Sequence, residues 1–295
     1  MKIVITGSLG HISRPLATTL IQQGHAVTII SSKADKQEDI EALGATAAIG
    51  PLEDAAFVTR AFTGADAVYA MVPPNLFAMP DPRDYYRLIG GNYAQAITQA
   101  GVKRVVYLSS MGAEQTEGTG IILGAHHVEQ LLNQLPGIAL THLRPGYFYY
   151  NLYQFTDMIK GAGLMQANYG GADPVVLVSP VDIAAAAAEE LTTVHAVKPV
   201  RYVASDERTC NEIAAVLGAA IGKPALQWKL CTDEQMQQQL ESRGLPALLA
   251  TSYVELFRIV HNGIFVKEYR QQAPIAMGAV KLETFAAEFA AAFKA

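Results

Sequence analysis

A glycine-punctuated turn follows a short apolar run at the start of the chain, and it constrains the fold more than any other feature. Ile3-Val4-Ile5 predicts a buried strand, and the G-x-x-G-x-x-S spacing from Gly7 to Ser13 predicts a tight turn that leads into a helix. Gly7 permits a positive φ, and Gly10 places no Cβ where a pyrophosphate would approach the N–H groups of that helix. The segment predicts a dinucleotide-binding strand-turn-helix unit. An ordinary glycine turn in an α/β protein is the alternative.

Strand and helix signals then alternate along the first half of the chain. The predicted strands are Ala26 to Ile30, Ala45 to Ile49, Ala67 to Val72, Val105 to Leu108 and Ile138 to Leu143, and the predicted helices are Lys36 to Leu43, Asp54 to Phe62, Tyr85 to Ala100 and about His126 to Leu135. This alternation indicates an α/β fold with a Rossmann-type doubly wound parallel sheet. We predict an NAD(P)-binding domain over residues 1–150 and a smaller, mixed, substrate-side lobe over residues 151–295, not fully separable from the first.

Composition excludes several classes of protein. The net charge is −5 over 295 residues and no Lys/Arg cluster occurs, which disfavours nucleic acid as a partner. Cys210 and Cys231 have no ligand spacing, so no metal site is expected. No apolar run reaches membrane-spanning length, and the N-terminus leads directly into the first strand. We therefore expect a cytoplasmic protein with a small-molecule substrate and no membrane partner, and a homodimer is a candidate assembly.

Three later segments, taken in order with the opening turn, carry a family resemblance. They are Leu143 to Leu152 with the pattern R-P-x-x-F-x-x-N, Val181 to Ala184 with D-I-A, and Thr209 to Ala214 with T-x-x-E-I-A. The chain resembles the NmrA-like branch of the atypical short-chain dehydrogenases/reductases. The resemblance implies a nucleotide-binding lobe and a small C-terminal lobe, with nicotinamide and substrate meeting between them.

The chain departs from short-chain reductases at the proton donor. Those enzymes use Tyr-x-x-x-Lys, in which a cation lowers the pKa of the phenol, and no tyrosine here has a lysine four residues later. Some NmrA-like members keep a lysine on the helix after the fifth strand, where this chain has Gly124 to Glu129. His126 or His127 is a candidate replacement, because imidazole titrates near neutral pH. A solvated pair of histidines at a helix start is the alternative.

The end of the second strand predicts the choice of cofactor. NAD-specific folds place an acidic residue there to bind the ribose hydroxyls, whereas this chain has Ser31, Ser32 and Lys33, which suit a 2′-phosphate. We predict NADPH in preference to NADH, with a surface loop solvated by Lys33 and Lys36 as the alternative. The candidate cofactor contacts are Gly7, Leu9, Gly10, His11, Ile12, Ser31, Ser32, Lys33, Met71, Pro73, Ser109 and Tyr147.

The missing Tyr-x-x-x-Lys pair also predicts the class of acceptor. A simple ketone needs a positioned acid as it is reduced, but a quinone, an azo dye or another conjugated acceptor delocalises the added charge. The candidate catalytic residues are His126 as proton donor and Tyr147 through ring packing. The aromatic run Tyr147 to Tyr150 could line a flat pocket or belong to the core. We predict an NAD(P)H-dependent oxidoreductase that reduces conjugated small molecules. The alternatives are a non-catalytic redox sensor acting through a protein partner and an isomerase or lyase that retains its cofactor.

Overall fold

The computed structural model describes residues 1–193, 199–272 and 275–294, and the chain divides into two compact units. Unit 1 contains Met1–Ser110, Gly124–Arg144 and Ile183–Arg201, and unit 2 contains Met111–Leu123, Pro145–Asp182 and Tyr202–Ala295. The chain therefore crosses between the two units several times. Residues 183–201 group with unit 1 because they carry most of a helix and the start of a strand that joins the first sheet.

Unit 1 is built around a seven-stranded sheet with the order β10-β6-β5-β4-β1-β2-β3. Its strands are β1 (Lys2–Ile5), β2 (Ala26–Ser31), β3 (Thr46–Ile49), β4 (Ala67–Ala70), β5 (Arg104–Leu108), β6 (Ala139–Pro145) and β10 (Val200–Val203). Each pairing from β6 across to β3 is parallel. The strand order reverses between β1 and β4, so the carboxyl ends of these two strands form the topological switch point at which such sheets bind ligands. The predicted Rossmann-type α/β fold is confirmed.

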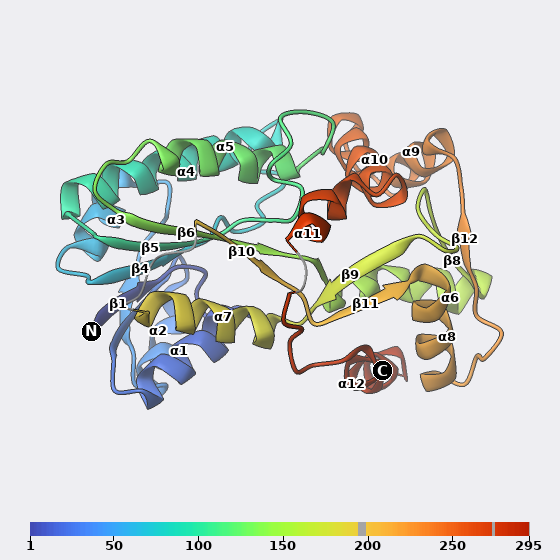
Figure 1. The fold of residues 1–295 in the computed structure, drawn as a ribbon, viewed down its shortest axis with the longest axis horizontal. Helices are drawn as coiled ribbons and strands as arrows, with labels where there is room; N and C mark the ends of the chain where they lie inside the picture. The colour runs from blue at the N-terminus through green and yellow to red at the C-terminus, as the bar shows by residue number, and fades with distance from the viewer. Residues whose placement is uncertain (194–198, 273–274, 295) are drawn as a thin grey trace. The chain divides into compact units, whose positions relative to one another are not determined.

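Helices cover both faces of this sheet. In Figure 1, α3, α4 and α5 lie on one face and α1, α2 and α7 on the other. The helices are α1 (Ser13–Gln22), α2 (Gln37–Ala42), α3 (Ala55–Phe62), α4 (Pro82–Ala100), α5 (Ile122–Asn133) and α7 (Pro180–Thr192), with a 3-10 turn, η1, at Ala34–Lys36. Apolar side chains of α3, α4, α5 and the strands fill the space between them, with Phe62, Tyr93 and Tyr107 fully buried. This packing holds the strand ends rigidly, which a binding site at those ends requires.

The capping residues explain where α4 begins. Asp81 accepts a hydrogen bond from the Arg83 N–H at 2.9 Å, and Pro82 occupies the first helical position, where its missing N–H costs nothing. Gly101 ends the helix with a φ of +69°. Helix α4 therefore begins about one turn before the predicted start at Tyr85, because Asp81 and Pro82 form a capping signal.

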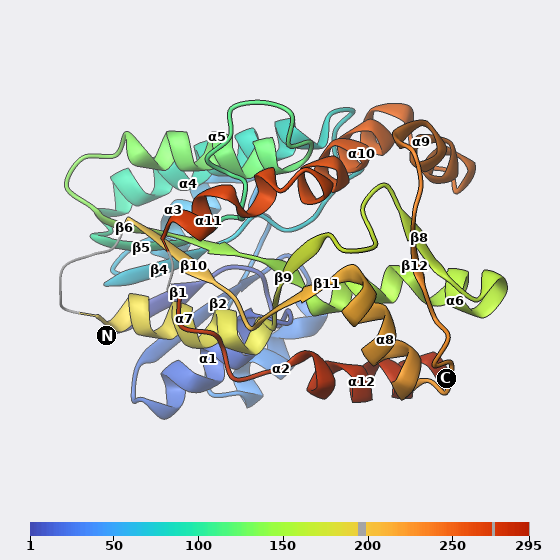
Figure 2. The ribbon, with the colours of Figure 1, turned by 45° about the vertical axis from the view of Figure 1, so that its right-hand side comes forward.

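Unit 2 contains two small sheets, β11-β9-β7 and β12-β8. Its elements are β7 (Tyr147–Phe148), η2 (Tyr149–Phe155), α6 (Thr156–Ala162), β8 (Met165–Ala167), β9 (Pro174–Val178), β11 (Asp206–Thr209), α8 (Cys210–Ala220), β12 (Trp228–Leu230), α9 (Asp233–Ser242), α10 (Ala247–His261), η3 (Ile264–Val266), α11 (Lys267–Gln271) and α12 (Leu282–Lys294). Figure 2 shows α12 packed along α8. Across the described ranges, no helix is long and apolar enough to cross a membrane.

Candidate functional site

The turn after β1 leaves no room for a side chain at its first glycine. Gly7 has a φ of +92°, and an added Cβ would lie 2.8 Å from the Ser13 hydroxyl oxygen and 3.0 Å from the Met71 sulfur. The Ser13 hydroxyl donates to the Thr6 carbonyl at 2.8 Å, which ties the start of α1 to the end of β1. Gly7 and Ser13 therefore hold the turn closed, the packing role predicted for a small residue at position 13.

The second glycine has a different environment. Gly10 is exposed, its N–H donates to the Gly7 carbonyl at 3.2 Å, and an added Cβ would approach only that carbonyl oxygen, at 3.0 Å. No described side chain caps the N-terminus of α1 at Ile12, and its first turn contains no acidic residue. Uncapped N–H groups beside an exposed glycine form a cradle that fits the pyrophosphate of a dinucleotide.

The cradle is fixed at the switch point between β1 and β4. The Thr6 hydroxyl accepts from the Met71 N–H at 2.8 Å, and the buried Tyr93 phenol donates to the Met71 carbonyl at 2.6 Å. Ser8 adopts a φ of +54° and is held by a bond from its N–H to the Ile30 carbonyl at 3.0 Å. Thr6 and Tyr93 were not identified from the sequence, because their partner is distant along the chain.

At the end of β2 the predicted phosphate donors separate into two kinds. The Ser31 hydroxyl is buried, 2.9 Å from the Ser8 hydroxyl oxygen and 3.2 Å from the Lys33 N–H, so it shapes the loop. Ser32 and Lys33 are exposed, and no described carboxylate forms an ion pair with Lys33. Lys36 instead pairs with Asp39 at 3.1 Å. An exposed cation without a described ion-pair partner suits a phosphate, and it distinguishes Lys33 from Lys36.

Arg14 adds a second such cation in the first turn of α1. It is exposed and has no ion-pair partner among the described residues. A positive charge at a helix N-terminus is unfavourable unless an anion is nearby. That rule is the sequence signal that could have identified Arg14.

Replacing Lys33 is expected to remove a preference for NADPH over NADH. A charge-assisted contact to the 2′-phosphate contributes about 1.5–3 kcal/mol, so the Lys33→Ala variant should lose a preference on the order of tenfold or more. Fluorescence titration with both dinucleotides measures this ratio. Lys36→Ala is the matched control and should retain the wild-type ratio. Equal affinities of the wild-type protein for the two dinucleotides would contradict the assignment.

Ser109, another predicted cofactor contact, belongs to a buried network. Its hydroxyl donates to Glu129 Oε1 at 2.5 Å, and Arg144 reaches both oxygens of Glu129, at 3.0 Å and 2.7 Å. Burial opposes ionisation of Glu129, but the Arg144 guanidinium and the Ser109 hydroxyl outweigh it and lower the pKa of this carboxyl. Glu129 and Arg144 thus join α5 to the end of β6, and the arginine of the R-P-x-x-F pattern is held by an ion pair.

The two adjacent histidines on α5 differ in their surroundings. His127 Nε2 lies 3.3 Å from Arg87 Nη2, and its buried Nδ1 has no partner among the described residues. Burial and the neighbouring Arg87 lower the pKa of His127, which keeps this ring neutral. The His126 ring is half-buried, and its centroid lies 5.9 Å from that of His127. His126 therefore remains the better candidate for a proton donor.

Tyr147 lies in unit 2 at the start of β7 and is 8% exposed. Its hydroxyl oxygen accepts from Gln154 Nε2 at 2.7 Å and from the Tyr169 hydroxyl at 3.1 Å. Burial raises the pKa of the Tyr147 phenol, so it remains protonated at neutral pH. Gln154 and Tyr169 were not identified from the sequence.

The aromatic run from Tyr147 to Tyr150 does not share one face. Tyr149 stacks on Phe285 of α12 with ring centroids 5.2 Å apart, and the rings of Phe148 and Tyr150 are 5.0 Å apart. The neighbouring Tyr153 also packs against α12. Tyr147, by contrast, lies beside the Tyr169 ring. The alternative in which the run lines a single flat pocket is therefore wrong. Backbone turns in η2 point successive rings in different directions.

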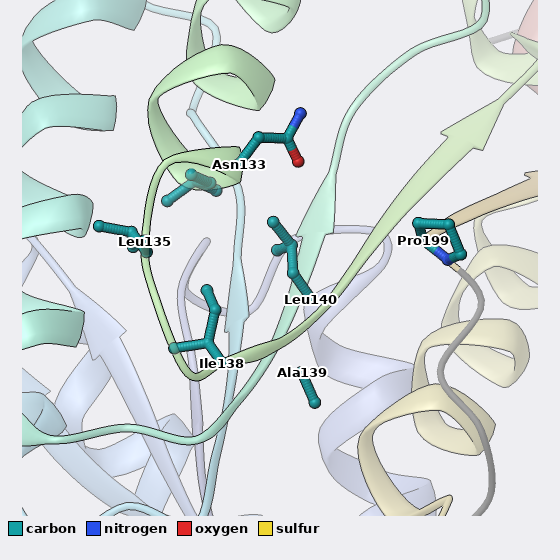
Figure 3. Close-up of a pocket in the computed structure, with 7 residues that line it drawn as sticks. Asn133, Leu135, Ile138, Ala139, Leu140 and Pro199 are labelled. Carbon is teal, nitrogen blue, oxygen red and sulfur yellow. The ribbon is translucent and has the colours of Figure 1, made fainter.

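A separate pocket lies at the opposite end of the sheet in unit 1 (Figure 3). It encloses about 250 Å³ at the amino end of β6, whereas the cradle lies at the carboxyl ends of β1 and β4. Its lining residues are Leu132, Asn133, Leu135, Ile138, Ala139, Leu140 and Pro199. The Asn133 side-chain oxygen lies 2.9 Å from His142 Nε2, so the polar end of that side chain already has a partner.

With this geometry established, comparison with known proteins identifies the family. The NmrA-like family model matches residues 1–279, and the chain belongs to this family. Among curated proteins, (4-alkanoyl-5-oxo-2,5-dihydrofuran-3-yl)methyl phosphate reductase of Streptomyces griseus is 29% identical over 75% of this chain and 74% of its own length. The NAD(P)H azoreductase of Xenophilus azovorans is 26% identical over 87% of this chain and 86% of its own length. These distant homologues are reductases.

A solved structure shows the same fold. An NADPH-dependent quinone oxidoreductase from Escherichia coli, crystallised with NADPH, superposes with a TM-score of 0.75 at 21% identity, covering 97% of this chain and 99% of that one. At this identity the likeness extends to the fold alone.

Proposed function

We propose that this protein is an NADPH-dependent reductase that transfers a hydride to a quinone-like or other conjugated small molecule. The observation that carries the proposal is the cradle of unit 1, where exposed Gly10 and the uncapped start of α1 stand at the β1/β4 switch point. Lys33, exposed at the end of β2, would receive the 2′-phosphate. When bound, the dinucleotide supplies a hydride, and one proton from another source completes the reduction of a quinone to its hydroquinone.

The side chains available for acid catalysis support conjugated acceptors. The chain has no Tyr-x-x-x-Lys pair, and burial keeps the pKa of Tyr147 high, so this phenol is a poor proton donor. Reduction of an unactivated ketone needs such a donor, whereas a quinone or azo group spreads the added charge over its own π-system. The relatives named for azo and quinone reduction support the same class of acceptor.

A panel of acceptors tests this proposal. With NADPH in excess, we expect sustained oxidation with 1,4-naphthoquinone and an azo dye, and little or none with cyclohexanone. Robust reduction of cyclohexanone would contradict the proposed acceptor class. Tight NADPH binding without turnover on any acceptor would instead favour the redox sensor.

Substitution of Tyr147 should separate its ring from its hydroxyl. Tyr147→Phe should keep most of kcat because the protonated phenol transfers no proton. Tyr147→Ala also removes the ring contact with Tyr169. It should lower kcat about tenfold, the size expected for the loss of such packing. Steady-state rates with 1,4-naphthoquinone measure both variants. An inactive Tyr147→Phe variant would show that a phenol acid operates.

His126 is the side chain proposed to supply the proton. His126→Ala is expected to lower kcat, because a positioned proton donor is lost. His127→Ala is the matched control, since His127 is kept neutral beside Arg87, and it should retain the wild-type kcat. If His126→Ala also kept the wild-type kcat, the proton would come from water.

A further inference from the structure

The Tyr147 hydroxyl of unit 2 carries a proton that it donates to no described residue. The oxygen of Tyr147 accepts from Gln154 Nε2 at 2.7 Å and from the Tyr169 hydroxyl at 3.1 Å. A phenol oxygen has two lone pairs and one proton, so these two bonds fill its accepting capacity. Its own proton has no acceptor among the residues that the structure describes.

Burial determines which of the two tyrosines carries this unused proton. If Tyr147 donated to Tyr169, the proton of Tyr169 would need another acceptor, but Tyr169 is 0% exposed and closed to water. Leaving a buried donor without a partner is costly. Tyr147 is 8% exposed, and its hydroxyl contacts the side chain of Gln154, which is at an exposed position. The hydrogen bonds therefore run from Tyr169 to Tyr147 and outward.

The neighbouring rings make the surroundings of this hydroxyl apolar. The Tyr169 ring packs against the rings of Trp228 and Phe257, with centroid distances of 5.1 Å and 5.2 Å. The Trp228 indole N–H is already donated to the Tyr169 carbonyl at 2.9 Å. An apolar wall with one unused hydroxyl proton is suited to a flat conjugated ligand that carries an oxygen.

We propose that the Tyr147 hydroxyl, oriented by Tyr169 and Gln154, donates a hydrogen bond to a carbonyl oxygen of the acceptor and so selects quinones over acceptors without oxygen. This inference rests on the proposed function for the identity of the ligand. The phenol keeps its proton throughout, so Tyr147 positions the acceptor and is not the source of the transferred proton. Removing the hydroxyl should therefore change binding of oxygen-bearing acceptors and leave other acceptors unaffected.

Equilibrium binding to the full chain saturated with NADP⁺ tests this, because the oxidised dinucleotide cannot reduce the ligand. Trp228 is the only tryptophan of the chain and packs on Tyr169, so its fluorescence reports binding at this site. For 1,4-naphthoquinone, Tyr147→Phe should raise Kd about threefold to tenfold, the effect of one neutral hydrogen bond. Gln154→Met, a substitution at an exposed position, should also raise this Kd.

Two controls make the result specific. Tyr149→Phe removes a phenol that donates to the Val280 carbonyl at 3.0 Å, and it should leave the Kd for naphthoquinone unchanged. Crystal violet contains no oxygen and should bind wild-type and Tyr147→Phe proteins equally. An unchanged naphthoquinone Kd in Tyr147→Phe, an equal loss for crystal violet, or no naphthoquinone binding by the wild type would overturn the inference. If the protein shows the expected binding pattern but never oxidises NADPH, the donor site is supported and only the proposed reductase activity is overturned.

Discussion

Gly10→Val is expected to abolish NADPH binding while leaving the protein folded. The branched side chain would occupy the space where the pyrophosphate must approach the N–H groups at the start of α1. Loss of two charge-assisted hydrogen bonds, each contributing about 1.5–3 kcal/mol, raises Kd by about a hundredfold or more. Folding should survive because Gly10 is exposed and an added Cβ would approach only the Gly7 carbonyl oxygen, at 3.0 Å. Calorimetric titration with NADPH and a denaturant unfolding curve measure the two effects.

Two other glycines serve as controls for this variant. Gly91 is exposed on α4 with open space around its position, so Gly91→Val should bind NADPH as the wild type does. Gly7→Ala should destabilise the turn itself, because Gly7 has a positive φ and a Cβ there would meet Ser13 and Met71. A folded Gly10→Val variant with wild-type affinity would show that the turn does not bind the dinucleotide.

Glu129→Gln is expected to lower the free energy of unfolding by about 3–5 kcal/mol, the cost of leaving a buried arginine without its counter-ion. Both partners are almost fully buried, with side chains 2% and 7% exposed for Glu129 and Arg144. Because the pKa of Glu129 is lowered in the folded state, its stabilisation is fully present above the ordinary carboxyl pKa of 4.5. That stabilisation is lost as the pH falls through the lower folded-state pKa. The difference between wild type and Glu129→Gln should therefore shrink below about pH 4.

Denaturant unfolding at neutral and acid pH checks this expectation. The double variant Glu129→Leu/Arg144→Met removes both charges and should be more stable than Glu129→Gln, because an apolar pair leaves no charge buried alone. Asp39→Ala, which breaks the exposed pair with Lys36, should change stability by about 1 kcal/mol or less. A Glu129→Gln variant as stable as the Asp39→Ala control would contradict the structural role of this pair.

The strand-turn-helix start was predictable because its determinants are local. Gly7, Gly10 and Ser13 lie within seven residues, and the conformation of each follows from its own sterics and its immediate neighbours. The alternation of apolar strands with amphipathic helices likewise indicated the parallel sheet. These features need no knowledge of which segments meet in space.

The features that were missed depend on contacts between distant segments. The hydroxyl of Ser31, predicted as a phosphate donor, contacts Ser8, and that of Ser109, a predicted cofactor contact, donates to Glu129. The division into units follows from β10 pairing in the first sheet, which joins segments far apart in the chain. Spacing in the sequence cannot reveal such pairings, because they depend on register and topology.

The aromatic run shows the same limit on a shorter scale. Tyr147 and Tyr149 are two residues apart, which would place them on one face of a strand, but β7 ends at Phe148 and the chain enters η2. Tyr149 then packs against Phe285, while Tyr147 meets Tyr169. The change of period from strand to 3-10 helix has no clear signal in four consecutive aromatic residues.

Anaerobic incubation of the protein with NADPH and 1,4-naphthoquinone tests the central claim most directly, with NADPH absorbance and hydroquinone formation followed together. The account predicts that each NADPH oxidised yields one hydroquinone, and that the Gly10→Val variant shows only the uncatalysed rate. If the wild-type protein binds NADPH tightly but oxidises it no faster than the Gly10→Val sample does, the assignment as a reductase is contradicted.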